Sequence, residues 1–214
     1  MQSSNPFAQT IKWYNDNAQT YANKIEHLPE LEYIKRFANL LKSGDKILDA
    51  GCAAGRDSKI FKDQGFEPTG IDIVENFIKL ARKKNPNIEF VHGDFRNLPF
   101  SDNTFAGIWA TACLLHSETT ADVKKALNEF YRVLEPKGII HISVKQQLDN
   151  KKTAKTSHQF SKGFKRFFRF FTAKEIKNYL TKAGFQILKL EDNSSAKGNR
   201  QKIKWIVVLA QKPE

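Results

Sequence analysis

Three acidic residues stand where three short apolar segments end: Asp49, Asp72 and Asp94. If these segments are parallel strands, their carboxyl ends meet at the edge where open α/β sheets bind ligands. Asp72 follows Gly51 by about 20 residues, the distance at which an acidic residue reaches ribose hydroxyls across a βαβ unit. Asp94 can accept a hydrogen bond from an adenine amino group, and Phe95 beside it can pack on the ring. The spacing therefore indicates a nucleoside-binding site.

A turn of small residues, Gly51-Cys52-Ala53-Ala54-Gly55, follows the first of these segments. Small side chains let the backbone approach a ligand closely. The helix expected from Arg56 would aim free N–H groups and a positive dipole end at that ligand. A dinucleotide site is the main alternative, but it prefers a second glycine where Ala53 stands and gives Asp94 no set role.

The elements that must position these residues alternate along the chain. Strands separated by helices at this spacing indicate βαβ units and a parallel sheet covered on both faces. Only the loop 192–203 joins the last two strands, so we expect them to form an antiparallel pair at one edge. The expected helices are 7–22, 31–41, 56–61, 74–84, 119–134 and one that begins at Thr172, and the expected strands are 46–50, 69–72, 88–91, 105–110, 139–144, 185–190 and 204–210.

Several runs of sequence resemble the signatures of class I S-adenosylmethionine (SAM)-dependent methyltransferases. The resemblance covers nearly the whole chain and lies in 47–57, Gly70-Ile71-Asp72, His92-Gly93-Asp94-Phe95, 105–116, 130–139, 166–172 and the front segment 13–21. It implies a doubly wound, Rossmann-like α/β sheet of seven strands in the order 3-2-1-4-5-7-6, with strand 7 antiparallel. It also implies SAM as the cofactor.

The resemblance further implies a division of the chain and a set of site residues. Residues 1–42 would form a helical cap on a methyltransferase domain, 43–214, with a basic and aromatic insertion at 145–171. Ala53 departs from the usual middle glycine, and Ala106 replaces an aspartate that usually follows the phenylalanine of the fourth strand. The implied cofactor-binding residues are Tyr14, Tyr21, Asp49, Gly51, Cys52, Ala53, Gly55, Arg56, Asp72, Ile73, Asp94, Phe95, Ala110 and Thr111.

The acceptor side is less specific in sequence. His116 is the best acid or base candidate because an ordinary imidazole titrates near neutral pH, but a histidine that only lines the pocket wall is the favoured alternative. We expect Tyr14, His116, Arg169 and Phe170 to contact the acceptor. No carboxylate lies between Ala110 and Leu115, so we expect no metal.

Two further residues are interpreted as structural rather than catalytic. Cys113 lacks the preceding proline and the acidic neighbour that a nucleophilic cysteine of RNA-methylating enzymes would have, so we interpret it as a small buried residue. His141 alternates within an apolar strand and is expected to be a core histidine with its hydrogen bonds satisfied.

The chain is basic, with a formal net charge of +12 and a pI near 9.6, which favours an anionic partner. Basic and phenylalanine side chains interleave in the segment 145–171, whose only acid is Asp149. That segment would either bind RNA, for example tRNA, or form a lid over an apolar pocket. We favour the lid and a small-molecule acceptor, with an RNA methyltransferase and a non-catalytic SAM-binding protein as alternatives.

Composition sets the compartment that we expect. No apolar run approaches the roughly 20 residues of a membrane helix, and residues 1–10 lack the features of a signal peptide. Two cysteines without metal-type spacing indicate reduced thiols. We therefore expect a cytoplasmic protein with no membrane partner, and the oligomeric state is not predicted.

Overall fold

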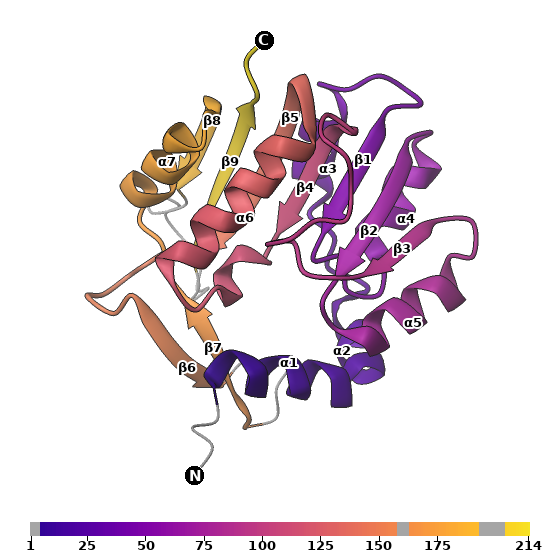
Figure 1. Cartoon of the computed structure of the whole chain (residues 1–214). Coiled ribbons are helices and arrows are strands. Elements are labelled where there is room, and N and C mark those ends of the chain that lie inside the picture. Colours follow the sequence, from indigo (N-terminus) through magenta and orange to yellow (C-terminus); the bar gives the residue numbers. More distant parts are fainter. Residues whose placement is uncertain (1–4, 158–162, 193–203) are drawn as a thin grey trace.

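A seven-stranded sheet forms the centre of the computed structural model, which describes residues 5–157, 163–192 and 204–214 (Figure 1). Its order is β3-β2-β1-β4-β5-β9-β8, with β1 to β5 parallel and β9 antiparallel to both neighbours. Because β8 and β9 are the sixth and seventh strands of this sheet, the predicted order and the antiparallel last strand are confirmed. The strands are β1 (Lys46–Ala50), β2 (Glu67–Asp72), β3 (Glu89–His92), β4 (Phe105–Thr111), β5 (Leu134–Lys145), β8 (Gln186–Asp192) and β9 (Trp205–Gln211).

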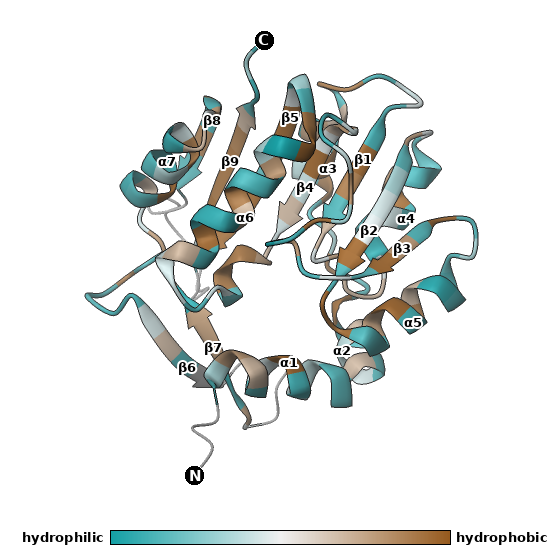
Figure 2. Ribbon diagram, viewed as in Figure 1, coloured by the Kyte–Doolittle hydropathy of each residue, from teal (hydrophilic) through white to brown (hydrophobic). Residues whose placement is uncertain are grey.

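Helices cover both faces of the sheet, because alternate strand residues point to opposite sides. Leu48 packs in the cluster beneath α6 (Thr120–Val133) and α7 (Ala173–Lys182), whereas Ile47 packs beneath α3 (Leu31–Ala38) and α4 (Arg56–Asp63). A further helix, α5 (Glu75–Lys84), packs against β3. Figure 2 shows the result, with apolar strands inside and hydrophilic residues on the outer side of α6. Capping boxes start both α6 and α7, and Thr172, the predicted start of the last helix, is the N-cap of α7.

The first predicted helix is divided in two at Asn17. Its halves are α1 (Pro6–Asp16) and α2 (Ala18–Ile25), and the Asn17 side chain donates to the Trp13 carbonyl at 2.9 Å. In Figure 1, α1 lies across the end of the sheet toward which β2 and β4 point. Tyr14 and Ala18 of this helical pair pack on Val74 and Phe77. The pair therefore covers the edge at which the three aspartates stand.

A hairpin that the sequence analysis did not predict forms a second, two-stranded sheet from the insertion 145–171. Its antiparallel strands are β6 (Thr153–Ser157) and β7 (Lys165–Arg169). β7 packs against α1, and the Phe167 amide donates to the Thr10 hydroxyl at 2.9 Å. Along β7, Arg166 and Phe168 are buried, Lys165 is exposed, and Phe167 and Arg169 are half-buried. The hairpin and α1 thus meet over one end of the sheet.

Candidate functional site

A cavity of about 290 Å³ lies between the carboxyl ends of the parallel strands, α1 and β7. It brings together most of the residues that the sequence analysis proposed: Tyr14, Tyr21, Asp49, Gly51, Cys52, Ala53, Arg56, Asp72, Ile73, Asp94, Phe95, Thr111 and His116. Gly55, Ala110, Arg169 and Phe170 do not line it. Sequence reasoning missed several residues of the wall, among them Phe7, Arg96, Lys145, Arg166 and Phe168.

The turn after β1 has the backbone conformation that small residues favour. Gly51 and Ala53 have positive φ angles of 76° and 46°, in the left-handed region. A Cβ at Gly51 would lie 2.6 Å from the Cβ of Cys113. Gly55 also has a positive φ, but a Cβ there would meet the Phe90 ring at 2.6 Å. Gly55 is thus required where the start of α4 approaches β3, away from the cavity.

Asp49 is buried at the end of β1 and accepts a hydrogen bond from the Ser58 hydroxyl at 2.6 Å. Burial, together with the negative charge of Asp57, raises the pKa of Asp49 to about 7. Asp57 itself accepts from Arg56 and from the Trp109 indole. The other donors of Arg56 reach the carbonyls of Ile25 and Leu28, so its guanidinium joins the end of α2 to α4.

Asp72 is held in a fixed orientation at the end of β2. Its Oδ2 accepts from the Ala53 amide at 3.0 Å, and its Oδ1 accepts from the Val74 amide at 2.8 Å. A carboxylate oxygen has two acceptor sites, so each oxygen keeps one for a ligand. Burial raises the pKa of Asp72 to about 6, although the backbone amides of Val74, Ala53 and Ile73 and the nearby His92 act to lower it. The residue can therefore receive two neighbouring hydroxyl groups.

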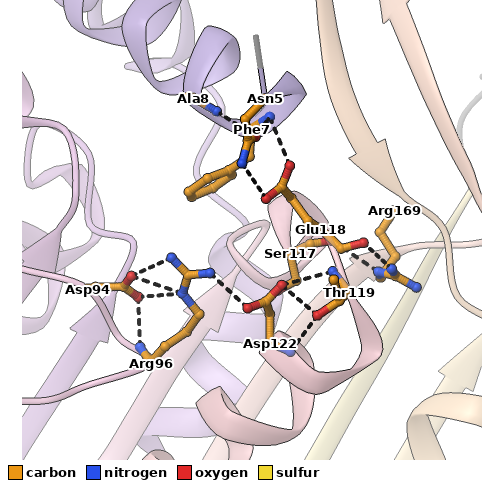
Figure 3. A network of polar contacts seen from close by, with 10 residues as sticks. All are labelled: Asn5, Phe7, Ala8, Asp94, Arg96, Ser117, Glu118, Thr119, Asp122 and Arg169. Atoms are coloured by element: carbon orange, nitrogen blue, oxygen red, sulfur yellow. Dashed lines mark hydrogen bonds and ion pairs between the residues drawn. The ribbon is translucent and has the colours of Figure 1, made fainter. Parts of the chain in front are cut away.

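Asp94 belongs to the polar network in Figure 3. Arg96 donates to both of its oxygens through Nε and Nη2, and its Nη1 reaches Asp122 at 2.9 Å. The Phe7 ring of α1 lies 5.2 Å from the same guanidinium. Asp94 thus lines the cavity with part of its acceptor capacity already used, and Phe95 beside it packs near Phe130.

Arg169 and Phe170 are not brought to the cavity, which corrects the expectation that they contact an acceptor. Figure 3 shows Arg169 donating to the backbone carbonyls of Ser117 and Glu118, so it holds the loop between β4 and α6. The Phe170 amide donates to the Lys152 carbonyl at 2.8 Å. Because side chains alternate along a strand, the cavity-facing positions of β7 are Arg166 and Phe168.

His116 lies, half-buried, between α1 and β7. Its Nδ1 lies 2.9 Å from the Phe167 carbonyl and must donate, so its Nε2 accepts from the Tyr14 hydroxyl at 3.1 Å. Tyr14 in turn accepts from Arg166. Burial, and then the positive charges of Arg166 and Lys145, lower the pKa of His116 to about 3. The expectation of a histidine that titrates near neutral pH is therefore wrong, because His116 is a neutral, weakly basic group.

Two other residues are placed in the interior. Cys113 is buried, and burial raises its pKa to about 12, so it stays a thiol. His141 is fully buried and stacks on Trp109 with 3.9 Å between ring centroids. Neither of its ring nitrogens has a hydrogen-bond partner among the described residues, so the expectation of a satisfied core histidine is wrong in that respect.

The chemistry of the cavity fits SAM. Gly51 provides a stretch of backbone without a side chain, and Asp72 offers two acceptor sites for ribose hydroxyls. The Thr111 hydroxyl is buried in the wall without a hydrogen-bond partner among the described residues, and a polar ligand would supply one. No group of three His, Cys, Asp or Glu that could hold a metal ion occurs in the described ranges. Within the same ranges, no helix is long and apolar enough to cross a membrane.

Known proteins resemble the chain in sequence and in fold. Residues 47–138 match a family model described as a methyltransferase domain. The chain is similar to demethylmenaquinone methyltransferase of Paenarthrobacter aurescens, with 32% identity over 48% of this chain and 40% of that protein. It is also similar to malonyl-[acyl-carrier protein] O-methyltransferase of Salmonella typhimurium, with 25% identity over 63% of this chain and 49% of that protein. The chain thus spans about half the length of these curated relatives or less.

A solved structure shares the fold over almost the full length. It is the 1,6-didemethyltoxoflavin-N1-methyltransferase of Burkholderia thailandensis, determined with 1,6-didemethyltoxoflavin and S-adenosylhomocysteine (SAH) bound. The TM-score is 0.72 at 22% identity, and the match covers 97% of this chain and 87% of that one. Residues 47–138 thus resemble a methyltransferase domain, and the chain shares the fold of this solved methyltransferase.

Proposed function

We propose that this chain is an enzyme that transfers the methyl group of SAM to a small-molecule acceptor. The observation that carries the proposal is one cavity that joins the carboxylates at the ends of β1, β2 and β3 to a covered chamber near β5 and β7. A nucleoside-bearing cofactor would occupy the first part, and an acceptor the second. SAM, when bound, supplies an activated methyl group on a sulfonium.

The cofactor roles follow from the donors and acceptors at each strand end. Asp72 would bind both ribose hydroxyls through its free acceptor sites. Asp94 and Phe95 would receive the adenine, while Asp49 and the turn from Gly51 to Ala53 would lie against the methionine part. Asp49 is suited to an ammonium group because a nearby positive charge favours its ionised form, which burial otherwise opposes.

The acceptor chamber favours direct in-line transfer rather than acid or base catalysis by His116. Holding a nucleophile in line with a reactive carbon supplies roughly 7–11 kcal/mol of the barrier without a catalytic proton transfer. His116 is neutral and hydrogen-bonded at both nitrogens, so its role is to fix the Tyr14 hydroxyl and, with it, α1 over the cavity. Tyr14, His116 and Phe168 would then form the wall that orients the acceptor.

The cap comprises α1 and α2 rather than the whole of residues 1–42. These two helices pack over the carboxyl ends of the strands through Tyr14 and Ala18, whereas Phe37 of α3 packs within the core on the face that also holds Trp109. We therefore include α3 with the methyltransferase domain. Movement of α1 and the β6–β7 hairpin would open the cavity for exchange of ligands.

A small acceptor fits the covered chamber better than RNA does. Arg166 points into the cavity and Arg169 is committed to loop carbonyls, so the two arginines of β7 are not free for phosphates on the surface. Lys162 of the basic segment lies outside the described residues, as do Lys197, Arg200 and Lys202 of the loop 192–203, which would extend a basic patch. The relatives' names, which include demethylmenaquinone and didemethyltoxoflavin methyltransferases, also support a small acceptor. A cytoplasmic location fits the two free, buried thiols.

Binding and turnover experiments test this function in two stages. Calorimetry should give micromolar affinity for SAM and SAH and no measurable NAD binding. A dinucleotide site prefers a glycine where Ala53 stands and gives Asp94 no set role, whereas a SAM site accommodates both residues. Labelled SAM incubated with fractionated cell extract should then yield a labelled small molecule. NAD binding tighter than that of SAM would refute the cofactor assignment. SAM binding without transfer to any fraction would favour a non-catalytic SAM-binding protein.

A further inference from the structure

Two cationic side chains lie together in the wall of the acceptor chamber. Lys145 is the last residue of β5, and Arg166 lies in β7; both line the cavity, with relative exposures of 5% and 2%. Burying an ionised group away from water is costly unless an opposite charge or hydrogen bonds compensate it. The partners of these two groups therefore decide what the chamber can hold.

Neither cation forms an ion pair with a carboxylate in the described parts of the chain. Arg166 donates through Nη1 to the Tyr14 hydroxyl, and its buried Nε has no hydrogen-bond acceptor. The Lys145 ammonium has no hydrogen bond or ion pair there, and its Nζ lies 3.4 Å from the centroid of the Phe168 ring. Four aromatic rings surround the Arg166 guanidinium at 5.2–5.5 Å, those of Trp13, Tyr14, Tyr21 and Phe168.

Aromatic faces attract a cation but carry no net charge, so this end of the cavity stays positive. The two cations also repel each other. Burial, and then the positive charge of Arg166, lower the pKa of Lys145 to about 7. His116 adds no negative charge because it is neutral. An anion between Lys145 and Arg166 would offset the repulsion between the two cations and supply the opposite charge that they lack.

We propose that the acceptor carries an anionic oxygen group, a carboxylate or a phosphate, which Lys145 and Arg166 bind within the chamber. This inference rests on the proposed methyl transfer and names the chemical class of its acceptor. Lys145 lies on the acceptor side because β5 is separated from β1 by β4, whereas the carboxylates assigned to the cofactor stand at the ends of β1, β2 and β3. Arg166 belongs to the same group because it contacts the Phe168 ring on which Lys145 also lies. Binding the anion there would orient the remainder of the acceptor toward the cofactor end.

Matched aromatic probes test the charge requirement directly on the full chain saturated with SAH. Benzoate presents a carboxylate, phenyl phosphate presents a phosphate, and benzamide is a neutral analogue of the same shape as benzoate. Calorimetry should show that benzoate or phenyl phosphate binds at least about tenfold more tightly than benzamide, because benzamide leaves both cations without a partner. The tighter anion identifies which group the acceptor carries.

Variants assign the binding to the two cations. Lys145→Met and Arg166→Gln should each weaken anion binding at least about tenfold and change SAH affinity less than about threefold. Arg166→Lys keeps the charge and should retain part of the affinity. Lys165→Met is the matched control, because Lys165 is exposed on the same strand. It should bind the anions as the parent protein does. If Arg166→Gln does not fold, Lys145→Met decides alone.

Three results would overturn the inference while leaving methyl transfer intact. These are equal binding of benzamide and the anions, no binding of any probe to the parent–SAH complex, or unchanged anion binding in a folded Lys145→Met protein. A tenfold loss of SAH affinity in both variants would also overturn it, because the pair would then bind the carboxylate of the cofactor. If the parent protein did not bind SAH, the proposed function itself would fail.

Discussion

Replacing Asp72 with alanine tests the best-defined contact of the cofactor site. Amide donors from Ala53 and Val74 already occupy one acceptor site on each carboxylate oxygen, at 3.0 and 2.8 Å. One site per oxygen remains, which matches the two hydroxyls of a ribose. The assay is calorimetry with SAH at pH 8, where a group whose pKa is about 6 is ionised.

The magnitude follows from these two hydrogen bonds. A hydrogen bond to a charged group is worth roughly 1.5–3 kcal/mol, and two would be worth roughly 3–6 kcal/mol if nothing replaced them. Alanine leaves space in which water can reach the hydroxyls, and it also removes the cost of desolvating a carboxylate. We therefore expect a loss of about 1.4–2.7 kcal/mol, which weakens SAH binding about 10–100-fold.

Two further variants make the result specific. Asp72→Asn keeps the shape but replaces one acceptor oxygen with a donor, so its affinity should lie between those of the parent and Asp72→Ala. Asp63→Ala removes an exposed carboxylate of α4 that pairs with Lys59, and it should bind SAH as the parent does. Unchanged SAH affinity in a folded Asp72→Ala protein would refute the assignment of Asp72 to the ribose.

Three other perturbations address stability, metals and RNA. Asp49→Asn should raise the Tm of the ligand-free protein by a few degrees above pH 7, since about 1 kcal/mol corresponds to about 2–4 °C at this size. The pKa of Asp49 in the folded protein, about 7, exceeds its ordinary value of 3.8, so ionisation of Asp49 destabilises the fold as pH rises from about 4 to 7. The increase in Tm should therefore vanish below about pH 4, where the carboxyl is protonated in both the folded and the unfolded protein. EDTA should leave turnover unchanged, and restoration of a lost activity by magnesium would contradict this. Transfer RNA should not bind with submicromolar affinity at physiological salt. An RNA acceptor would be favoured if log K for RNA binding fell steeply with log salt concentration, by about 0.7 per phosphate contacted, and if alanine at Lys151, Lys155 and Lys165 reduced that slope.

The sheet and the gathering of the three aspartates at one cavity could be predicted from sequence because their signals are local. Apolar strands such as 139–144, the turn at Gly51 and the aspartate after each of the first three strands are visible in short windows, and topology brings them to one edge. Even there, the sequence did not show that Gly55 packs against Phe90 or that Arg96 donates hydrogen bonds to the Asp94 carboxylate. Both facts depend on where a side chain from another element lies.

The acceptor end could not be predicted in the same way. In β7 the buried face carries Arg166 together with Phe168, so hydropathy does not alternate along the strand and does not show which side chains of 166–172 face the cavity. The low pKa of His116 likewise arises from burial between α1 and β7, which are far apart in sequence. Tertiary burial decides these properties, and no window of sequence contains it.

The electrostatics of the two ends of the cavity share one physical principle. Buried carboxylates at Asp49 and Asp72 have raised pKa values, and the buried amine of Lys145 has a lowered one, so burial drives each group toward its neutral form. Groups of this kind lower the stability of the ligand-free fold, and they gain compensation when a ligand of complementary polarity binds. With the proposed ligands, the cofactor end would receive hydroxyls and an ammonium, and the acceptor end would receive an anion. These opposite preferences would orient both ligands, because reversing either one would place like charges together in a buried site.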